Sequence, residues 1–354
     1  MLKGRIDGRE DSLGDGVRIK DIAKIAGVAV GTVSRVLNNH ATVTESIRRK
    51  VESAILATGY ELDLTAQTMR GQRSRLVACA IRDFDIPRFA IFIREAESVL
   101  RGNGYTLLLA STTNRPEVEL TLLRTFERRK VDGVMMTISD EAHSGVLSAL
   151  GAAKMPVLLI DRDRIETTDR VTADHRLGAK LATDHLLGLG HRRIGMLVGD
   201  ANAFPSRARL EGFGDAYAEV GLEPDLQFVR RKVLTPEDAF RETVSLMSSP
   251  TPPTALFVAA MDMLGGTLRA LRTLRRGVGS ELSIVAGSDS ELAELHTPSI
   301  TAVAWDLAEM GRHAATLLLE RMRGEAPASH RCLVLPTKLI IRDSCRPPDA
   351  RRSA

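Results

Sequence analysis

The peptide of residues 19–37 reads Ile-Lys-Asp-Ile-Ala-Lys-Ile-Ala-Gly-Val-Ala-Val-Gly-Thr-Val-Ser-Arg-Val-Leu. Apolar residues recur at helical spacing on both sides of Gly27, which predicts two short amphipathic helices joined by a turn. We expect one small core from the apolar residues of this peptide, namely Ile19, Ile22, Ile25, Ala26, Val33, Val36 and Leu37. The pattern is typical of a helix-turn-helix, a unit that binds DNA by placing its second helix in the major groove.

The second helix carries the residues that would read DNA. Its start and outer face hold mostly small side chains that permit close approach to base edges, namely Val30, Gly31, Thr32, Ser34 and Arg35. The alternative interpretation is an ordinary helical hairpin packed on a larger domain, since short apolar periodicities are common in proteins. The residues that follow favour the DNA-binding interpretation.

A third helix is predicted directly after this hairpin. Thr44 can cap its start, Gly59 can end it, and its apolar stripe would complete a three-helix core: Ile47, Val51, Ala54 and Ile55. The basic run Arg48, Arg49 and Lys50 can contact DNA phosphates. A charge run alone is usually a solvated helix face, so its meaning here depends on the hairpin beside it.

The excess basic charge of the chain lies at its amino-terminal end. The 354 residues carry a formal net charge of +4, from 49 Lys and Arg against 45 Asp and Glu. The first 75 residues hold 13 of these cations and 9 of these anions, so the remainder holds 36 of each. A cationic module on a neutral body suits a polyanionic partner, because Lys and Arg gain affinity by releasing condensed counterions from nucleic acid.

The composition argues against a secreted, metal-bound or membrane protein. Cys79, Cys332 and Cys345 are odd in number and widely spaced, which fits neither a disulfide framework nor a structural metal site. Residues 1–16 lack the apolar run of a secretory signal, and no later segment is long enough to cross a bilayer. We expect a cytoplasmic protein associated with the bacterial nucleoid. Residues 1–16 are then a disordered tail or the result of a misplaced start codon.

A short polar segment separates the predicted DNA-binding module from the rest of the chain. Residues 61–71 read Glu-Leu-Asp-Leu-Thr-Ala-Gln-Thr-Met-Arg-Gly, in which Asp63 can cap a helix of two turns and Gly71 can end it. Such a short helix is marginal in isolation, because nucleation costs more than its few hydrogen bonds return. The segment is either a plain linker or a switch that folds on a partner.

These motifs resemble the LacI/GalR (lac repressor) family of transcription regulators along almost the whole chain after Val17. The most specific matches are Lys-Asp-Ile-Ala-Lys-Ile-Ala-Gly-Val at 20–28 and Thr-Val-Ser-Arg-Val-Leu-Asn at 32–38. Further matches follow in the family's order: Gly59-Tyr60, Val131-Asp132-Gly133, Leu159-Ile160-Asp161-Arg162, Leu189-Gly190-His191-Arg192-Arg193-Ile194, Arg209-Leu210-Glu211-Gly212-Phe213 and Leu335-Pro336-Thr337-Lys338.

The resemblance implies that residues 63–70 form a hinge helix, which in this family folds on operator DNA and inserts an apolar side chain into the minor groove. Met69 occupies the position of that wedge, and methionine is among the side chains that unstack base steps. Leu62 and Asp63 depart from the family's usual proline and asparagine, and an added anion near phosphates weakens hinge affinity. The resemblance adds these positions to the expected DNA contacts: Asn38, Thr44, Ala66, Gln67 and Met69.

From Leu76 onward, apolar runs alternate with amphipathic stretches, which predicts parallel sheets flanked by helices. The predicted strands are 76–81, 106–110, 133–138, 157–160, 194–199, 255–259 and 282–286, and the predicted helices are 89–101, 117–129, 176–189, 210–220 and 263–275. The fold class is α/β, with two doubly wound lobes after the three-helix module. The resemblance implies a periplasmic-binding-protein-like body whose chain crosses between lobes near Asp174, Ile300 and Leu335.

The predicted organisation has five parts. A tail covers residues 1–16, a helix-turn-helix domain covers 17–61 and a hinge covers 62–73. An effector-binding and dimerisation body covers 74–345, and a second tail covers 346–354. No heptad repeat follows the body to join dimers into tetramers, so we expect a homodimer.

Ligands of open α/β sheets bind at the carboxyl ends of strands, so residues just after the strands are candidates. They are Asp83, Phe84, Asp161, Met261 and Asp289. Arg209 could donate a planar fork to a ligand, and Phe89 and Trp305 could stack on it. The alternative is that each Asp caps a helix and each aromatic fills core. The resemblance places Arg209 and Asp289 at effector-contacting positions, and Met261 replaces an asparagine that usually binds a ligand hydroxyl.

The predicted function is a sequence-specific transcriptional regulator, most consistent with a repressor, that binds a pseudo-palindromic operator under the control of a sugar or sugar derivative. Alternatives are a regulator answering to a nucleobase or a protein corepressor, and a solute-binding protein, which the missing signal peptide opposes. No phosphate loop or nucleophile elbow indicates an enzyme, and the histidines are scattered. We therefore expect no catalytic residue, metal or cofactor.

Overall fold

The computed structural model describes residues 17–37, 42–60, 73–84, 88–259 and 263–348. The chain divides into two compact units, Met1–Gln72 and Arg73–Ala354. Among the helices of the described segments, none has the length and apolar character that a bilayer crossing requires. The hinge positions Asp63, Ala66, Gln67 and Met69 lie outside the described residues, as do Asn38 and Met261.

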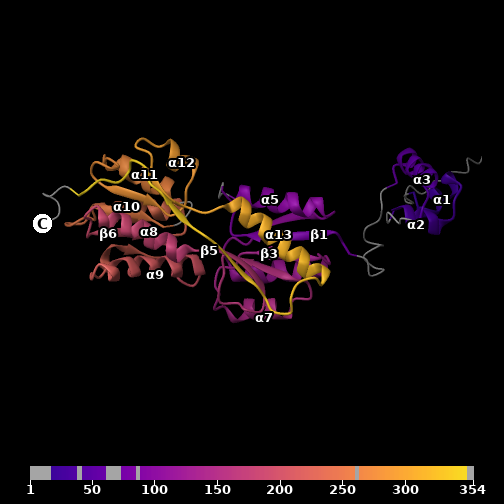
Figure 1. Cartoon of the computed structure of the whole chain (residues 1–354), viewed down its shortest axis with the longest axis horizontal. Helices are drawn as coiled ribbons and strands as arrows, with labels where there is room; N and C mark the ends of the chain where they lie inside the picture. The colour runs from indigo at the N-terminus through magenta and orange to yellow at the C-terminus, as the bar shows by residue number, and fades with distance from the viewer. Residues whose placement is uncertain (1–16, 38–41, 61–72, 85–87, 260–262, 349–354) are drawn as a thin grey trace, which may run out of the picture. The chain divides into compact units, whose positions relative to one another are not determined.

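The first unit is a three-helix module made of α1 (Ile19–Ala26), α2 (Val30–Leu37) and α3 (Glu45–Thr58), as Figure 1 shows. Gly27 ends α1 and Gly59 ends α3 with φ of 65° and 62°, a left-handed conformation that glycine adopts without a side-chain clash. The three helices share one buried core: Ile22, Ala23, Ala26, Val33, Val36, Val51 and Ala54. The predicted helix-turn-helix and its third helix are therefore confirmed.

The prediction that Ile25 belongs to this core is wrong, because Ile25 is 58% exposed. Successive helix residues advance by about 100°, so the buried Ile22, Ala26 and Ala23 span an arc of about 100° and Ile25 lies about 60° outside it. Thr44 stands at the predicted start of α3, but its side chain makes no capping bond to the helix. The exposed N–H groups there can bond to water instead.

The second unit, the body, contains two six-stranded sheets. The first sheet has the order β11-β5-β4-β3-β1-β2, from strands β1 (Leu76–Ile81), β2 (Thr106–Ser111), β3 (Gly133–Met136), β4 (Val157–Ile160), β5 (Asp169–Ala173) and β11 (Cys332–Leu335). The second has the order β12-β10-β9-β8-β6-β7, from β6 (Ile194–Leu197), β7 (Val229–Arg230), β8 (Ala255–Val258), β9 (Ser283–Ala286), β10 (Thr301–Ala304) and β12 (Lys338–Ile340). All neighbouring strands pair in parallel except β10 and β12.

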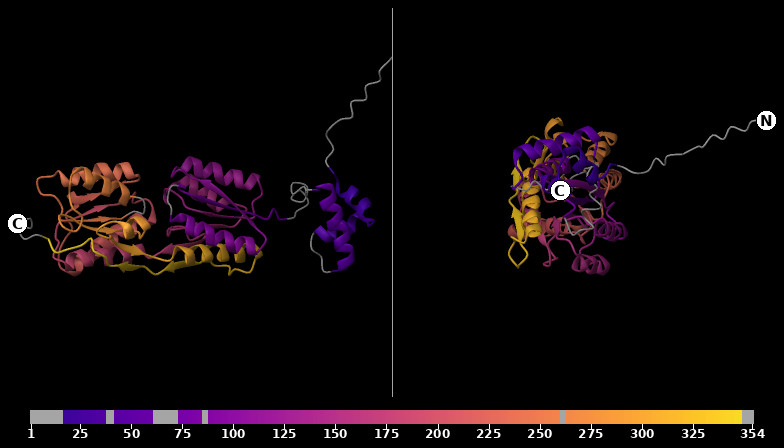
Figure 2. Two further views of the ribbon diagram at one scale, coloured as in Figure 1. Left: turned by 90° about the horizontal axis from the view of Figure 1, so that it is seen from above. Right: turned by 90° about the vertical axis from the view of Figure 1, so that its right-hand side faces the viewer.

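Helices cover both faces of each sheet (Figure 2). The first lobe carries α5 (Phe89–Gly102), α6 (Pro116–Arg128), α7 (Ser144–Ala152) and α13 (Leu307–Arg323). The second lobe carries α8 (His175–Gly188), α9 (Phe204–Glu219), α10 (Pro236–Met247), α11 (Leu264–Thr273), α12 (Glu291–Leu295) and the 3₁₀ turn Leu226–Phe228. Alternate residues of β1 enter different cores, since Cys79 packs with Phe92 of α5 and Ala78 packs with Leu123 of α6. The central strands are therefore buried on both faces.

All seven predicted strands are present, which confirms the two-lobed α/β architecture. Several predicted ends are wrong by one or two residues, and α9 begins at Phe204 rather than at residue 210. Sequence analysis did not predict the remaining strands and helices, among them α13. Crossings near Asp174 and Leu335 are confirmed by the sheet order. The crossing predicted near Ile300 occurs after Ala304, because β10 still pairs with β9 in the second lobe.

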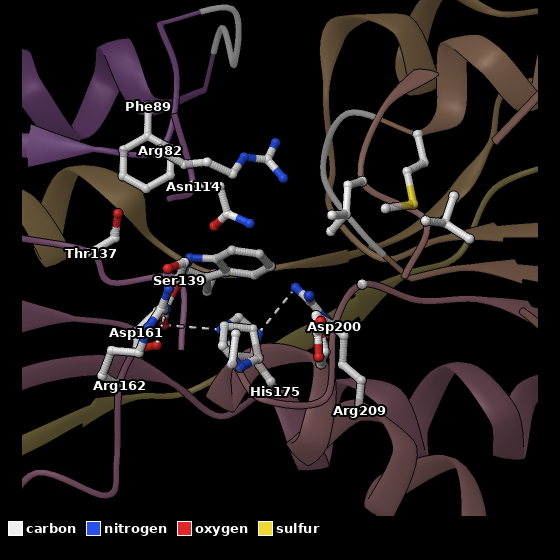
Figure 3. A pocket seen from close by; sticks show the side chains of 18 residues that line it. Arg82, Phe89, Asn114, Thr137, Ser139, Asp161, Arg162, His175, Asp200 and Arg209 are labelled. Carbon is white, nitrogen blue, oxygen red and sulfur yellow. Dashed lines mark hydrogen bonds and ion pairs between the residues drawn. The ribbon is translucent and has the colours of Figure 1, made fainter. Parts of the chain in front are cut away.

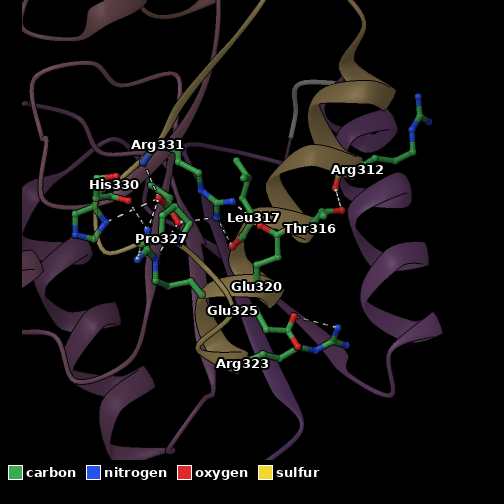
Figure 4. Close-up of polar contacts among 12 residues, drawn as sticks. Arg312, Thr316, Leu317, Glu320, Arg323, Glu325, Pro327, His330 and Arg331 are labelled. Atoms are coloured by element: carbon green, nitrogen blue, oxygen red, sulfur yellow. Dashed lines mark hydrogen bonds and ion pairs between the residues drawn. The ribbon is translucent and has the colours of Figure 1, made fainter.

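A buried charge cluster joins α13 and the start of β11 to β5 in the first lobe. Asp169 of β5 is 2% exposed and accepts hydrogen bonds from Arg321 of α13 at 2.8 Å and from the backbone N–H of Arg331 at 2.8 Å. Arg331 also donates to the carbonyl of Leu317, as Figure 4 shows. Burial alone would raise the pKa of Asp169, but the two arginines lower it. The cluster therefore fixes α13 and the strand after it to the first sheet.

Candidate functional site

Helix α2 divides its residues cleanly between the core and the solvent. Val33 and Val36 are buried. The residues predicted to meet DNA lie on the remaining surface, where Val30, Gly31 and Arg35 are exposed and Thr32 and Ser34 are half-buried. Apart from its two neighbours and the backbone of its own helix, a Cβ added at Gly31 would meet no atom of the described residues within 4 Å, so packing among them does not require glycine there.

A cavity of about 140 Å³ lies within the body and is lined by residues of both lobes. It is about ten times larger than the volume that a single water requires. Most of the lining residues follow strand ends or begin helices, where side chains converge in an open α/β fold. They include Arg82, Phe89, Asn114, Thr137, Ser139, Asp161, Arg162, His175, Asp200, Ser206, Arg209, Met263 and Trp305, many of which are labelled in Figure 3.

A hydrogen-bonded chain runs from one lobe to the other through His175, the first residue of α8. Its Nε2 lies 3.0 Å from Oδ1 of Asp161, which follows β4, and its Nδ1 lies 3.3 Å from Nη2 of Arg209 on α9 (Figure 3). A carboxylate accepts and a guanidinium only donates, so the ring must be neutral, with its proton on Nε2. Protonation of Nδ1 would turn it into a second donor facing Arg209.

The pKa of His175 agrees with this assignment. Burial lowers it below its ordinary value, and the charge of Arg209 lowers it further against the opposing effect of Asp161. Burial would raise the pKa of Asp161, but His175 and the backbone N–H of Ala173 lower it overall. The Asp161 carboxyl is therefore ionised and the His175 ring is neutral at neutral pH. Trp305 packs its ring against His175 in an edge-to-face contact, with centroids 5.2 Å apart.

Two buried polar atoms at this cavity have no hydrogen-bond partner among the described residues. They are the hydroxyl oxygen of Thr137 and the indole Nε1 of Trp305. Buried polar groups are normally bonded, because an unmade bond costs about 1–3 kcal/mol. Arg162 differs, since it donates to the carbonyl of Ile138 from Nε at 2.7 Å and also to the carbonyl of Asp161. The unbonded atoms indicate a cavity that accepts a polar ligand.

The structure brings four of the predicted ligand residues to this cavity, namely Phe89, Asp161, Arg209 and Trp305. Phe84 is 53% exposed and is not among the lining residues. Asp289 lines a second cavity, to which Trp305 also contributes, and its carboxylate binds Arg342 at 2.7 Å. Asp289 therefore already has a partner, which lies just after β12. In the described part of the chain, no cluster of His, Cys, Asp and Glu could hold a metal ion.

Sequence analysis missed several residues of the cavity. Arg82, Asn114, Ser139 and Asp200 all lie after the ends of parallel strands, so the same strand-end rule could have found them. His175 also follows a parallel strand, but that strand, β5, was not predicted from the sequence. It reaches the cavity because β5 crosses directly into α8.

An outward-facing helix on a small three-helix unit and a polar cavity between two α/β lobes together define a class of protein. That class is the ligand-responsive DNA-binding transcription regulator. Two family models match the sequence: "Bacterial regulatory proteins, lacI family" over residues 18–62, and "Periplasmic binding protein-like domain" over residues 183–345.

The chain belongs to the LacI family of transcriptional regulators. It is 30% identical over 331 residues to the HTH-type transcriptional repressor PurR of Haemophilus influenzae strain PittEE, covering 93% of this chain and 98% of that protein. A solved complex of the transcriptional regulator CelR with cellobiose is 29% identical, with a TM-score of 0.69 over 93% of this chain and 99% of that one. The lac repressor dimer bound to operator and an anti-inducer has the same fold, with a TM-score of 0.81, 24% identity and coverage of 94% and 100%.

Members of the family are DNA-binding transcription regulators controlled by effectors, and this chain is one of them. The helix-turn-helix and the two-lobed body that sequence analysis predicted are confirmed by these matches.

Proposed function

We propose that this chain is a transcriptional repressor whose operator affinity is set by a small metabolite, a sugar or sugar derivative, bound in the cavity between the lobes. The observation that carries this proposal is the chain from Asp161 through His175 to Arg209, because it joins the two lobes at the wall of the cavity. A hydroxylated ligand there would bond to groups from both lobes at once. The CelR–cellobiose complex, a relative with a bound sugar, supports the same ligand class.

The DNA-reading residues of the proposal are those on the outer surface of α2, with Arg35 as the main donor to base edges. Arginine reads guanine through two parallel hydrogen bonds in the major groove. Gly31 allows the backbone of α2 to approach the bases, since the module itself does not need glycine at that position. The hinge contacts Ala66, Gln67 and Met69, together with Asn38 and Thr44, remain part of the proposal. Met261 remains a proposed effector residue.

A homodimer would present two copies of α2 to successive major grooves. A helix of eight residues reaches few base pairs alone, so specificity requires a second copy. Dimer symmetry then requires a pseudo-palindromic operator. In this proposal the repressor binds DNA in the bacterial nucleoid. It catalyses no reaction, as expected for a member of a family of DNA-binding regulators.

Contacts between the lobes could transmit the effect of the ligand. Arg207 of α9 donates to the buried carboxylate of Glu141 at 3.2 Å and also to Asp163, so it ties the second lobe to the first beside the cavity. Glu141 in turn accepts the backbone N–H of Asp163 at 2.8 Å. A ligand that favours one arrangement of the lobes changes how strongly these contacts of Arg207 and Glu141 hold the two lobes together. A coupling of about 1–3 kcal/mol would change operator affinity about 5- to 150-fold.

A planar nucleobase is the second candidate ligand. The specific observation in its favour is that Phe89 and Trp305 both line the cavity and offer aromatic surfaces. Calorimetry of the full-length protein with purines and with sugars separates the two candidates.

The proposal is tested by selecting duplexes from a random-sequence pool with the full-length protein. We expect a pseudo-palindromic consensus that binds at least about a thousandfold more tightly than random duplex. Sugars, sugar derivatives and purines are then added to the selected complex, and one of them should change its affinity. The absence of any sequence preference, with and without these compounds, would overturn the proposed function.

A further inference from the structure

Polar contacts join the two lobes of the body beside the cavity. Nη2 of Arg207, on α9 of the second lobe, donates to Oε2 of Glu141 at 3.2 Å and also to Asp163. The backbone N–H of Glu141 donates to the carbonyl of Asn202 at 3.3 Å, and the side-chain amide of Asn202 donates to Asp140 at 3.3 Å. We call these residues the clasp: Asp140, Glu141 and Asp163 of the first lobe, and Asn202 and Arg207 of the second.

Glu141 is the buried centre of the clasp. Its side chain is fully buried, and a buried carboxylate is stable only when hydrogen bonds replace its lost hydration. Oε1 accepts the backbone N–H groups of Asp163 at 2.8 Å and of Arg164 at 3.2 Å, both from its own lobe. Oε2 accepts from Arg207 of the other lobe. One oxygen of Glu141 is therefore bonded within the first lobe and the other across the two lobes.

Arg162 of the first lobe does not replace Arg207 as the partner of Glu141. The charge of Arg162 attracts three carboxyl groups at once, those of Glu119, Glu141 and Asp161, and is repelled by the charge of Arg207. Its guanidinium group donates its hydrogen bonds to backbone carbonyls of its own lobe. The hydrogen bond to Oε2 of Glu141 therefore comes from the second lobe.

The clasp residues are sequence neighbours of residues that line the cavity. These neighbours are Ser139 and Arg162 in the first lobe, and Asp200, Ala203 and Ser206 in the second. Figure 3 shows Ser139 and Arg162 on one side of the cavity and Asp200 on the other. A rotation that moves the lobes apart would break the clasp and would also separate the two sides of the cavity wall.

We propose that the clasp holds the two lobes of the body closed before an effector binds. This inference rests on the proposed function, because the same cavity holds the proposed effector, and it adds how that site is regulated. The clasp and an effector that bonds to both lobes stabilise the same closed arrangement. Arg207 is a positioning residue, since it sets the arrangement of the lobes and is not among the residues that line the cavity. Under the proposed function, loss of the clasp also changes operator affinity without any effector.

The fluorescence of Trp305 measures the opening of the lobes directly. Trp305 is the only tryptophan of the chain, lines the cavity and is 6% exposed. We expect acrylamide to quench effector-free, full-length Arg207→Gln at least about twice as strongly as the wild type, because an open body admits the quencher. Arg207→Lys should lie between the two, because lysine keeps the charge but lacks the planar fork that reaches two carboxylates.

Glu141→Gln tests the same contact from the other lobe. The amide keeps an oxygen for the two backbone N–H groups of its own lobe but turns the atom that faces Arg207 into a donor. We expect the same increase in quenching as in Arg207→Gln and no further increase in the double variant, because both changes remove one shared contact. Arg176→Gln is the matched control, since Arg176 binds Asp215 at 2.6 and 3.0 Å within the second lobe. Circular dichroism and thermal unfolding verify the fold of each variant.

Unchanged quenching in Arg207→Gln, or an equal increase in Arg176→Gln, would refute the inference. Increases that add in the double variant would refute it as well, because Arg207 and Glu141 would then act separately.

The affinity of effector-free Arg207→Gln for the selected operator distinguishes these failures from failure of the proposed function. We expect this affinity to differ at least about threefold from that of the wild type. Stronger quenching with unchanged operator affinity contradicts the proposed coupling of the body to the module and leaves the clasp supported.

Discussion

The three-helix module and the two-lobed body hold their functional side chains in opposite ways. In the module, Arg35 and Gly31 stand on the exposed face of α2, and the core behind them is made by other residues. In the body, Arg209 and His175 are buried at 6% and 3% exposure and are bonded to each other. Recognition and stability are therefore separable in the module and coupled in the body.

Glycines show the same difference. Gly212 of α9 lies where α9 crosses α8, and an added Cβ would lie 2.0 Å from the carbonyl oxygen of Arg176. Gly31 of α2 has no such neighbour among the residues that the structure describes. Glycine is needed for packing in the body, whereas in the module it leaves room for a partner.

The largest expected effect comes from Gly212→Ala. The added methyl group cannot fit against a backbone oxygen, so the helices must separate, at a cost of about 3 kcal/mol or more in the free energy of unfolding. Gly214→Ala is the matched control on the same helix, since its Cβ would meet nothing within 4 Å. Urea denaturation of both variants measures the difference. Equal unfolding free energies of Gly212→Ala and Gly214→Ala would contradict the conclusion that helix packing in the body requires glycine at position 212.

Arg35→Ala tests whether DNA recognition in the module is separable from its stability. Loss of one bidentate base contact costs about 1–3 kcal/mol, which lowers affinity for the selected operator about 5- to 150-fold. Thermal unfolding should be unchanged, because Arg35 is exposed. Electrophoretic mobility shift with operator and with random duplex measures the specific loss. Equal weakening on both duplexes would assign Arg35 to phosphate rather than to base edges.

Gly31→Ala should have a smaller effect. We expect it to preserve or raise the stability of the module and to lower its affinity for the operator. Alanine favours a helix over glycine by about 1 kcal/mol, so the module should be as stable or more stable. Operator affinity should fall, because the methyl group keeps α2 from its closest approach. Fluorescence anisotropy of labelled operator gives the affinity. An operator affinity equal to that of the wild type would show that the surface of α2 at Gly31 does not meet DNA.

The smallest effect concerns His191, a buried residue of the body that meets Thr254 at 2.8 Å and the carbonyl of Arg346 at 2.9 Å. Burial lowers its pKa to about 4, so the folded body prefers the neutral ring. Its contribution to stability is present in full above the ordinary value of 6.5 and is lost as the pH falls through about 4.

When the pH falls from 7 to 6, the unfolding free energy should therefore decrease more in the wild type than in His191→Gln. The two decreases should differ by less than about 1 kcal/mol. Urea denaturation at both pH values measures this difference. A larger loss in the variant than in the wild type would contradict the sign.

The module could be predicted almost completely from the sequence because its contacts are local. The spacing of Ile22, Ala26, Val33 and Val36 determined both helices and their core. The prediction differs from the structure at Ile25, which is exposed, and at Thr44, whose side chain makes no capping bond. The seven predicted strands of the body were equally clear, since most are buried and buried strands read as continuous apolar runs. The edge strand β2 was found by its apolar run although Leu108 and Leu109 are exposed.

The remaining parts of the body depend on contacts between distant residues. Helix α13 itself carries a local signal, since Leu307, Met310, Ala314 and Leu318 recur at helical spacing and Gly324 ends it, so it could have been predicted. Its attachment to β5 through Asp169 and Arg321, which are 152 residues apart, leaves no local pattern. The same is true of Asp289, whose partner Arg342 follows β12 and is far away in the sequence. His175 could not be recognised from spacing alone, because only the path from β5 into α8 brings it beside Asp161.

In the proposed mechanism, a ligand bound between Asp161 and Arg209 controls how tightly the module holds its operator. This control is measured as the affinity of full-length wild type and of Arg209→Ala for the selected operator, with and without the tightest-binding compound among the sugars, sugar derivatives and purines. We predict that the ligand changes the affinity of the wild type about 5- to 150-fold. We also predict that Arg209→Ala binds the operator like the ligand-free wild type and does not respond. A variant that responds as fully as the wild type would contradict the account.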